Sequence, residues 1–423
     1  MTRALLLVCA TASCLAAQSA PAPSAADLAR AKRILAMTPI VDGHNDVPWE
    51  IRESPDHPRD VEAYDLRTPR KGKDTDLARM KAGMMGGQFW SVYIPGEIKD
   101  SGFARVQAEQ IDIARRMIAR YPERLTFART AAEGRRATAA GKVASFLGME
   151  GGHAIENSLG TLRAFYDLGA RYMTLTHNVT LDWADAAQDS AKHGGLTPFG
   201  REVVREMNRL GMLVDLSHVS PGVMSHALDV SEAPIIFSHS SARAIADHKR
   251  NVPDSILRRL PKNGGVVMVT YVPGFVSEAV RTHGITRGAA HRELRARLGN
   301  DSAAVRRELA AWDAAHPAPV ATLRDVADHL DHIKKVAGAD HVGIGGDFDG
   351  TGGEHPVGLE DVSTYPALIA ELARRGWTDA ELRKVAGENI MRVLTQAEQV
   401  AARLQRTRAP STKTIEELDR RRM

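Results

Sequence analysis

Short apolar runs recur along the chain, and longer segments with helical periodicity separate them. The runs that indicate strands cover residues 40–42, 87–94, 143–149, 172–175, 212–216, 234–237, 266–271 and 341–345. Between these runs, amphipathic helices are predicted over residues 103–120, 159–168, 197–210, 223–228, 253–260 and 323–337. Strands that alternate with helices in this way predict a parallel sheet covered by helices.

Eight such units favour closure into a (β/α)8 barrel, a TIM barrel of the α/β class, over an open doubly wound sheet. The open sheet loses its main support because no Gly-x-Gly-x-x-Gly motif follows the first strand. Residues 277–321 are charged, rich in Arg and Ala and helical in pattern. We therefore predict a barrel domain over residues 38–400 with a helical insertion between strands 7 and 8.

The two ends of the chain fall outside this repeating pattern. Residues 1–19 combine a basic start with an apolar stretch too short to cross a bilayer, which is typical of a signal peptide. Lipid attachment at Cys14 is the alternative, although the residues before it match the usual lipobox poorly. We expect an exported protein, either periplasmic or secreted, without a membrane span in its mature form.

Two further terminal segments are predicted. Residues 20–37 form a linker and a helix capped by Ser24, and residues 401–423 form a polar tail. We expect this tail to be solvated and frayed, and its charged end predicts that no glycolipid anchor is present. The sequence assigns it no role.

Charge and cysteine content narrow the chemistry. The 56 basic and 52 acidic residues give a net charge of only +4 and form no long basic stripe, so we expect no nucleic-acid partner. The chain has 2 cysteines, Cys9 and Cys14, and both lie in the predicted signal peptide. Disulfides and cysteine nucleophiles are thereby excluded from the mature domain. Its chemistry must come from His, Asp, Glu, Arg and hydroxyl groups.

Titratable residues cluster where the predicted strands end. In a barrel of this kind, the carboxyl ends of the strands and the loops that follow them carry the functional side chains. The residues found at these positions are His44, Asp46, Glu150, His177, His218, His239 and Asp347. They are expected to meet on one rim of the barrel.

Several of these residues form a pattern that fits metal ligands. His44 and Asp46 are two positions apart, so an extended backbone points them to the same face, and apolar strands each end in Ser-His at His218 and His239. Each histidine taken singly is more often a structural residue, but the set together favours a metal site. Glu150, flanked by glycines, has two oxygens that can bridge two cations. Imidazoles and carboxylates suit zinc, with other divalent ions left open.

Seven segments carry a family resemblance. They are Val-Asp-Gly-His-Asn-Asp (41–46), Gly-Met-Glu-Gly-Gly-His (148–153), Leu-Thr-His-Asn (175–178), Asp-Leu-Ser-His-Val-Ser (215–220), Phe-Ser-His-Ser-Ser (237–241), Arg-Asn-Val-Pro-Asp (250–254) and Gly-Gly-Asp-Phe-Asp-Gly (345–350). With these motifs the chain resembles the membrane (renal) dipeptidases, zinc peptidases among the amidohydrolase barrels. The motifs follow one another over most of the predicted mature chain.

The resemblance implies a centre with two Zn²⁺ ions per chain. In it, His44 and Asp46 hold one ion, His218 and His239 hold the other, and Glu150 bridges them. This chain departs from the family pattern after strand seven. Relatives of the mammalian enzyme are rich in Asn and Tyr there, whereas residues 270–275 of this chain read Thr-Tyr-Val-Pro-Gly-Phe. This difference leaves open which dipeptide side chains the protein prefers.

The resemblance also implies roles in substrate binding and catalysis. His177 contacts the scissile carbonyl or its oxyanion, Arg250 binds the C-terminal carboxylate, and Asp347 binds the substrate amine and transfers a proton. Taken alone, Arg250 is more often part of a surface ion pair. Asp349 competes with Asp347 for its role, and either residue is also a candidate for capping the next helix or turn.

The function expected from the sequence is that of a zinc-dependent dipeptidase acting through a metal-bridging hydroxide, with Glu150, His177 and Asp347 as catalytic residues. Its substrates are expected to be dipeptides with a free C-terminal carboxylate, with L,D-dipeptides among the candidates. A deaminase or phosphotriester hydrolase is an alternative, but many such enzymes bridge their metals with a lysine, and strand four ends in Leu-Thr-His. A metal-binding protein without turnover is another alternative. The sequence leaves the assembly open, with a homodimer as one candidate.

Overall fold

The computed structural model describes residues 22–98 and 102–419. The predicted signal peptide with Cys9 and Cys14 lies outside the described residues, as does the end of the tail at 420–423. The first described helix, α1 (Ala25–Met37), begins as predicted. Ser24 caps it by accepting a hydrogen bond from the backbone N–H of Asp27, whose carboxylate accepts one from the backbone N–H of Ser24.

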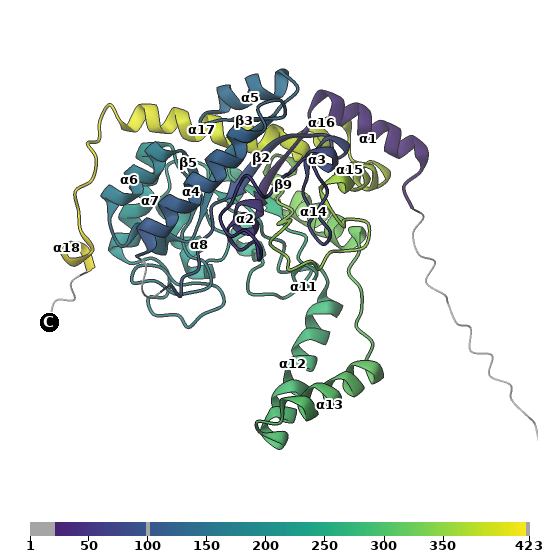
Figure 1. The fold of residues 1–423 in the computed structure, drawn as a ribbon. Coiled ribbons are helices and arrows are strands. Elements are labelled where there is room, and N and C mark those ends of the chain that lie inside the picture. Colours follow the sequence, from purple (N-terminus) through teal and green to yellow (C-terminus); the bar gives the residue numbers. More distant parts are fainter. Residues whose placement is uncertain (1–21, 99–101, 420–423) are drawn as a thin grey trace, which may run out of the picture.

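A closed parallel barrel forms the centre of the described chain (Figure 1). The sheet order is β2-β1-β9-β8-β7-β6-β5-β4-β3, and β2 also pairs with β4, which closes a ring of eight strands. The strands are β1 (Ile40–Asn45), β2 (Met85–Ser91), β3 (Leu125–Phe127), β4 (Val143–Glu150), β5 (Ala170–Thr174), β6 (Leu213–Asp215), β7 (Ile236–Phe237), β8 (Val266–Val269) and β9 (Val342–Ile344).

All eight predicted strands are present, with boundaries that differ by up to three residues. The prediction missed β3, which pairs Leu125 with Val143 at the start of β4, while β5 pairs with the end of the same strand. A strand of three residues is too short to show an alternating pattern. The prediction also ended the first strand too early, because β1 continues to Asn45 and contains His44.

Helices surround the barrel (Figure 1). They are α2 (Val47–Arg52), α3 (Leu77–Ala82), α4 (Phe103–Arg120), α5 (Ala131–Ala139), α6 (Leu159–Leu168), α7 (Pro198–Leu210), α8 (Pro221–Val230), α9 (Asp254–Leu257), α10 (Leu260–Asn263), α11 (Pro273–Val276), α14 (Leu323–Ala337), α15 (Tyr365–Arg374), α16 (Asp379–Arg383) and α17 (Asn389–Leu404). The helix predicted over 253–260 was wrong as one element, because the chain forms α9 and α10 instead. Pro261 has no backbone N–H, so a single helix through this point would lack the hydrogen bond to the Leu257 carbonyl.

The predicted helical insertion between the seventh and eighth barrel strands is confirmed. It consists of α12 (Glu278–Leu298) and α13 (Ser302–Ala315), which pack against each other and project away from the barrel in Figure 1. Only Ala304 and Val305 of these two helices are buried. The insertion therefore contributes little to the core of the barrel.

The C-terminal segment is not frayed where the structure describes it. Figure 1 shows the yellow chain passing from α17 to the short helix α18 (Ile415–Asp419), which contacts α7. The Asp419 carboxylate accepts hydrogen bonds from the Thr197 hydroxyl at 2.6 Å and from the Phe199 N–H at 2.8 Å. Residues 405–419 are mostly exposed, as expected of a solvated tail, but the Asp419 side chain ties this segment to the start of α7, so the expected fraying was wrong up to residue 419.

An aromatic and aliphatic cluster packs among the barrel strands. It includes the side chains of Val41, Phe89, Phe146, Tyr172, Leu213, Ile236, Val266 and Met268, all buried. The hydroxyl of Tyr172 lies 2.8 Å from Nδ1 of His44, so this cluster reaches the candidate functional site. Among the described residues, no helix has both the length and the apolar character that a membrane span requires.

Candidate metal centre and substrate cavity

The carboxyl ends of the barrel strands bring the predicted site residues together. His44 lies in β1, Glu150 ends β4, and Asp46 directly precedes α2. The remaining predicted residues of the rim, His177, His218, His239 and Asp347, follow β5, β6, β7 and β9 respectively. Parallel strands place all of these ends on one rim, which explains why residues far apart in the sequence converge.

Glu150 lies between two groups of candidate ligands. Its Oε1 is 2.9 Å from Nε2 of His218 and 3.3 Å from Nε2 of His239, while its Oε2 is 3.4 Å from Nε2 of His44. Asp46 completes the second group, with Oδ2 at 3.3 Å from Nε2 of His44. One carboxylate thus offers one oxygen to each group, which is the geometry that a bridging ligand needs.

Each of the three histidines has an outer partner on Nδ1 and directs Nε2 inward. His44 Nδ1 lies 2.8 Å from Tyr172 Oη, His218 Nδ1 lies 3.2 Å from Asn178 Oδ1, and His239 Nδ1 lies 2.8 Å from Ser238 Oγ. Metal-ligating histidines are held in the same way. His44 Nε2 is buried and has no hydrogen-bond partner in the described structure. A cation between these groups would supply the missing partner.

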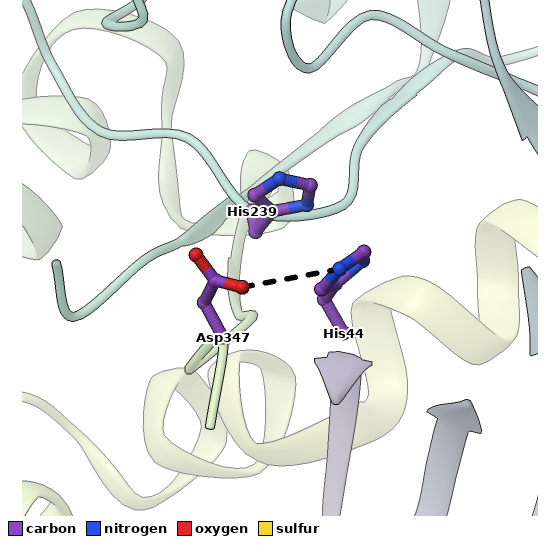
Figure 2. A group of neighbouring side chains, drawn as sticks. All are labelled: His44, His239 and Asp347. Atoms are coloured by element: carbon purple, nitrogen blue, oxygen red, sulfur yellow. Dashed lines mark ion pairs between the residues drawn. The ribbon is translucent and has the colours of Figure 1, made fainter. Parts of the chain in front are cut away.

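Asp347, expected from the sequence to bind the substrate amine and transfer a proton, also brings its carboxylate to this centre. Its Oδ1 lies 3.9 Å from Nε2 of His44, as the dashed line in Figure 2 marks, and His239 lies beside both residues. The backbone φ of Asp347 is +65°, a conformation that residues other than glycine seldom adopt. The backbone at Gly350 passes so close to the carboxylates of Asp46 and Asp347 that a Cβ at this position would collide with both.

Burial and neighbouring charges set the protonation of these groups. Burial lowers the pKa of His218 and of His239 well below the usual range, which keeps both imidazoles neutral and able to ligate a metal. Burial also opposes a charge on His44, but Tyr172 and the carboxylates of Glu150 and Asp46 raise its pKa well above the usual value. In the metal-free protein His44 is therefore the imidazole of these three that carries a positive charge, with both ring nitrogens protonated.

A cavity of about 430 Å³ opens onto these groups, a size typical of small-molecule sites. Its lining residues are Asp46, Trp49, Glu50, Tyr93, Glu150, His177, Asn178, Gln188, His218, His239, Arg250, Val272, Phe275, Asp347, Asp349, Gly350, Thr351 and Gly352. His177 Nε2 lies 4.0 Å from Oε1 of Glu150, and the His177 ring packs against Tyr93 with centroids 4.7 Å apart. A ligand in the cavity would thus contact His177 and the candidate metal centre together.

Arg250 is a buried cation at this cavity. Only 1% of the residue is exposed, and its Nε and Nη1 have no hydrogen-bond partner in the described structure. Burial lowers the pKa of Arg250 to about 10. Its guanidinium carbon lies 5.4 Å from the centroid of the Phe275 ring. The alternative of a surface ion pair therefore does not hold for Arg250, and its free donors suit an anionic ligand.

The partners behind the histidines had no role that the sequence pattern predicted. Asn178 and Ser238 directly follow or precede predicted site residues, so adjacency to the motifs was the available signal. Tyr172 offered no such signal, because it lies in the middle of its strand and reaches His44 across the barrel. Such a contact depends on which side chains meet inside the closed barrel, and a local sequence pattern does not show this.

A barrel whose strand ends gather histidines and carboxylates around a substrate-sized cavity is typical of metal-dependent hydrolases. Residues 28–408 match the sequence profile of the membrane dipeptidase family, peptidase family M19, so the chain belongs to this family. It is a metallo-dipeptidase. The deaminase and phosphotriester hydrolase alternatives are set aside by this result.

Solved structures of similar proteins agree with this family. The probable dipeptidase PvdM from Pseudomonas aeruginosa is 25% identical, with 89% of this chain and 99% of that chain covered and a TM-score of 0.75. Dipeptidase AC, a metallo peptidase of family M19, is 28% identical over 85% and 98% of the two chains, with a TM-score of 0.68. A metallo peptidase from Rhodobacter sphaeroides, liganded with a phosphinate mimic of the dipeptide L-Ala-D-Ala, is 26% identical over 85% and 99%, with a TM-score of 0.69.

Proposed function

We propose that the chain is a zinc-dependent dipeptidase that hydrolyses dipeptides with a free C-terminal carboxylate, L,D-dipeptides included. The observation that carries this proposal is the position of Glu150, whose two oxygens face His44 on one side and His218 with His239 on the other. Two cation positions sharing one carboxylate fit a binuclear hydrolase.

The donor set fits two zinc ions. His44, Asp46 and Glu150 have ligand atoms close enough together to hold one ion, and Glu150, His218 and His239 have them for a second. Imidazole nitrogens and carboxylate oxygens are the ligands zinc uses in catalytic sites. Bound zinc ions would supply activated water near neutral pH and polarise the scissile carbonyl.

The substrate's ends fit two opposite charges of the cavity. Arg250 has unpaired donors that suit a C-terminal carboxylate through two parallel hydrogen bonds. Asp347, which lines the same cavity, binds the amine and carries the proton to the leaving group. Burial, with the carboxylates of Asp46 and Glu150, raises the pKa of Asp347 well above its usual range, against the opposing charges of His44 and Arg250. His177 orients the carbonyl between these ends.

The Rhodobacter sphaeroides neighbour, with its bound mimic of L-Ala-D-Ala, supports including L,D-dipeptides among the substrates. Val272 and Phe275 line the cavity in the segment that departs from the mammalian-type family pattern. We propose that this apolar lining favours small apolar C-terminal side chains over charged ones.

Turnover of a substrate panel tests this function. Purified protein stripped of metal and then reloaded with Zn²⁺ is assayed with L-Ala-L-Ala, L-Ala-D-Ala, L-Ala-D-Glu and the C-terminal amides of the first two. The proposal expects zinc-dependent hydrolysis of the two alanine dipeptides, weaker hydrolysis of L-Ala-D-Glu and loss of activity with the amides. Equal turnover of acids and amides contradicts the role of the free carboxylate. Metal uptake without any dipeptide hydrolysis favours a binding protein instead.

Export and pairing of the mature protein are also proposals. Removal of residues 1–19 on the way out of the cytoplasm is tested by N-terminal sequencing of protein recovered from the cell envelope and the medium. Formation of a homodimer is tested by light scattering after gel filtration. Intact N-termini in the cytoplasm contradict the first proposal, and a monomer mass contradicts the second.

A further inference from the structure

Ser238 and Asp215 lie in line behind His239, on the side away from the candidate metal centre. The Ser238 hydroxyl donates to Oδ2 of Asp215 at 2.6 Å and lies 2.8 Å from Nδ1 of His239. Both residues are fully buried. We propose that Asp215 and Ser238 are positioning residues that fix the proton of His239 on Nδ1 and leave Nε2 as the metal ligand; this inference rests on the proposed metal centre.

The tautomer follows from counting protons along this chain of hydrogen bonds. A serine hydroxyl has one proton, and the Ser238 hydroxyl directs it to Asp215. Toward His239 the Ser238 oxygen can then only accept, so the proton between them belongs to Nδ1 of His239. The lone pair of the neutral ring is left on Nε2, which faces Oε1 of Glu150 at 3.3 Å.

Asp215 is held in place by four donors from three strand ends. Its Oδ1 accepts from the backbone N–H of Ser217 at 3.1 Å and of Ser238 at 2.8 Å, and its Oδ2 accepts from the Thr174 hydroxyl at 2.5 Å as well as from Ser238. These partners belong to the ends of β5, β6 and β7. Asp215 therefore fixes the position of the Ser238 hydroxyl relative to the loops that carry His218 and His239.

The loops after β6 and β7 are also tied directly to each other. The backbone N–H of His239 donates at 3.1 Å to the hydroxyl of Ser217, which is the residue before His218. His44 has a different outer contact, because the hydroxyl of Tyr172 donates to the carbonyl of Gly43 at 3.2 Å. The carboxylate behind the partner hydroxyl polarises the Ser238 oxygen, which makes it a stronger acceptor for the Nδ1 proton of His239.

Ser238→Ala tests the proposal, with Ser240→Ala as the matched control. Ser240 is also fully buried, and its hydroxyl lies 3.2 Å from Ser217 Oγ rather than against an imidazole. Zn²⁺ affinity of each metal-free protein is measured by competition with a chromophoric chelator. We expect Ser238→Ala to bind one of its two zinc ions roughly 10- to 100-fold more weakly, Ser240→Ala to bind as the wild type does, and Ser238→Thr, which keeps the hydroxyl, to regain affinity.

Neutron diffraction from crystals of the wild-type protein gives a test that needs no variant. The proposal expects a deuteron on Nδ1 of His239, pointing to Ser238, and a deuteron on Nε2 overturns it. Unchanged zinc affinity in Ser238→Ala overturns it too, as does an equal loss in Ser240→Ala. A wild-type protein that takes up no Zn²⁺ contradicts the proposed function instead, so the two failures are distinguishable.

Discussion

Oε1 of Glu150 lies 2.9 Å from Nε2 of His218, although the two residues come from different strand ends of the barrel. The other oxygen of the same carboxylate faces His44. Because each oxygen faces a different group of ligands, both candidate cation positions depend on Glu150.

Glu150→Gln is expected to abolish dipeptide hydrolysis while the protein stays folded. An amide presents one oxygen and one N–H₂ group, so it cannot offer an acceptor to both sides. The loss in kcat should exceed the roughly 10- to 100-fold cost of changing an outer partner of a metal ligand. Circular dichroism checks the fold, and metal analysis should show fewer than two zinc ions per chain. Substantial hydrolysis by a folded Glu150→Gln protein refutes the bridging role.

Arg250→Met is expected to weaken the recognition of free carboxylates. Removing one partner of a buried charged pair costs about 2–5 kcal/mol, so kcat/KM for L-Ala-D-Ala should fall at least about 30-fold. The variant should discriminate little between this dipeptide and its C-terminal amide. Arg258→Met is the control, because the Arg258 side chain is 65% exposed. A variant at position 250 that still prefers the free acid contradicts the assignment.

Comparing Asp347→Asn with Asp349→Asn separates the two candidates for proton transfer. Asp347 lies near His44 and the metal groups, whereas Asp349 accepts a hydrogen bond from the backbone N–H of Asp74 at 3.0 Å. Loss of a general acid typically costs 10²–10⁴-fold, so kcat of Asp347→Asn should fall by roughly this factor, and far more than kcat of Asp349→Asn. Steady-state kinetics on both variants check this, and the reverse order assigns the role to Asp349.

Zinc uptake is expected to depend on pH through His44. Its raised pKa in the metal-free protein means that it holds a proton near neutral pH, and zinc must displace that proton to bind Nε2. Affinity should therefore rise as the pH rises from 6 to 8, and protons should be released on binding. Calorimetric titrations in buffers of different ionisation enthalpy measure this release. Uptake without proton release contradicts a protonated His44.

Asp419→Ala is expected to lower stability without changing catalysis. Asp419 caps α7 through Thr197 and Phe199, and losing such a cap costs about 0.5–2 kcal/mol. Chemical denaturation should show this loss, with kcat/KM per folded molecule unchanged because α18 contacts α7 rather than the cavity. Unaltered stability contradicts the docking of the C-terminal segment.

The sequence predicted the barrel and the rim residues because both depend on local patterns. Strand runs end in titratable residues such as Glu150 and His218, and parallel pairing then brings those ends together. The contact of Tyr172 with His44 and the burial of Arg250 depend on which side chains meet across the closed barrel. The contact of Asp419 with Thr197 also joins segments that are far apart in the sequence, so no local pattern could predict it.

Anomalous diffraction at the zinc absorption edge, from crystals of the zinc-loaded wild-type protein, tests the central claim most directly. We expect two peaks in each chain, on either side of the Glu150 carboxylate, one beside His44 and Asp46 and the other beside His218 and His239. A single peak that Glu150 does not contact, or zinc bound only elsewhere on the protein, contradicts it.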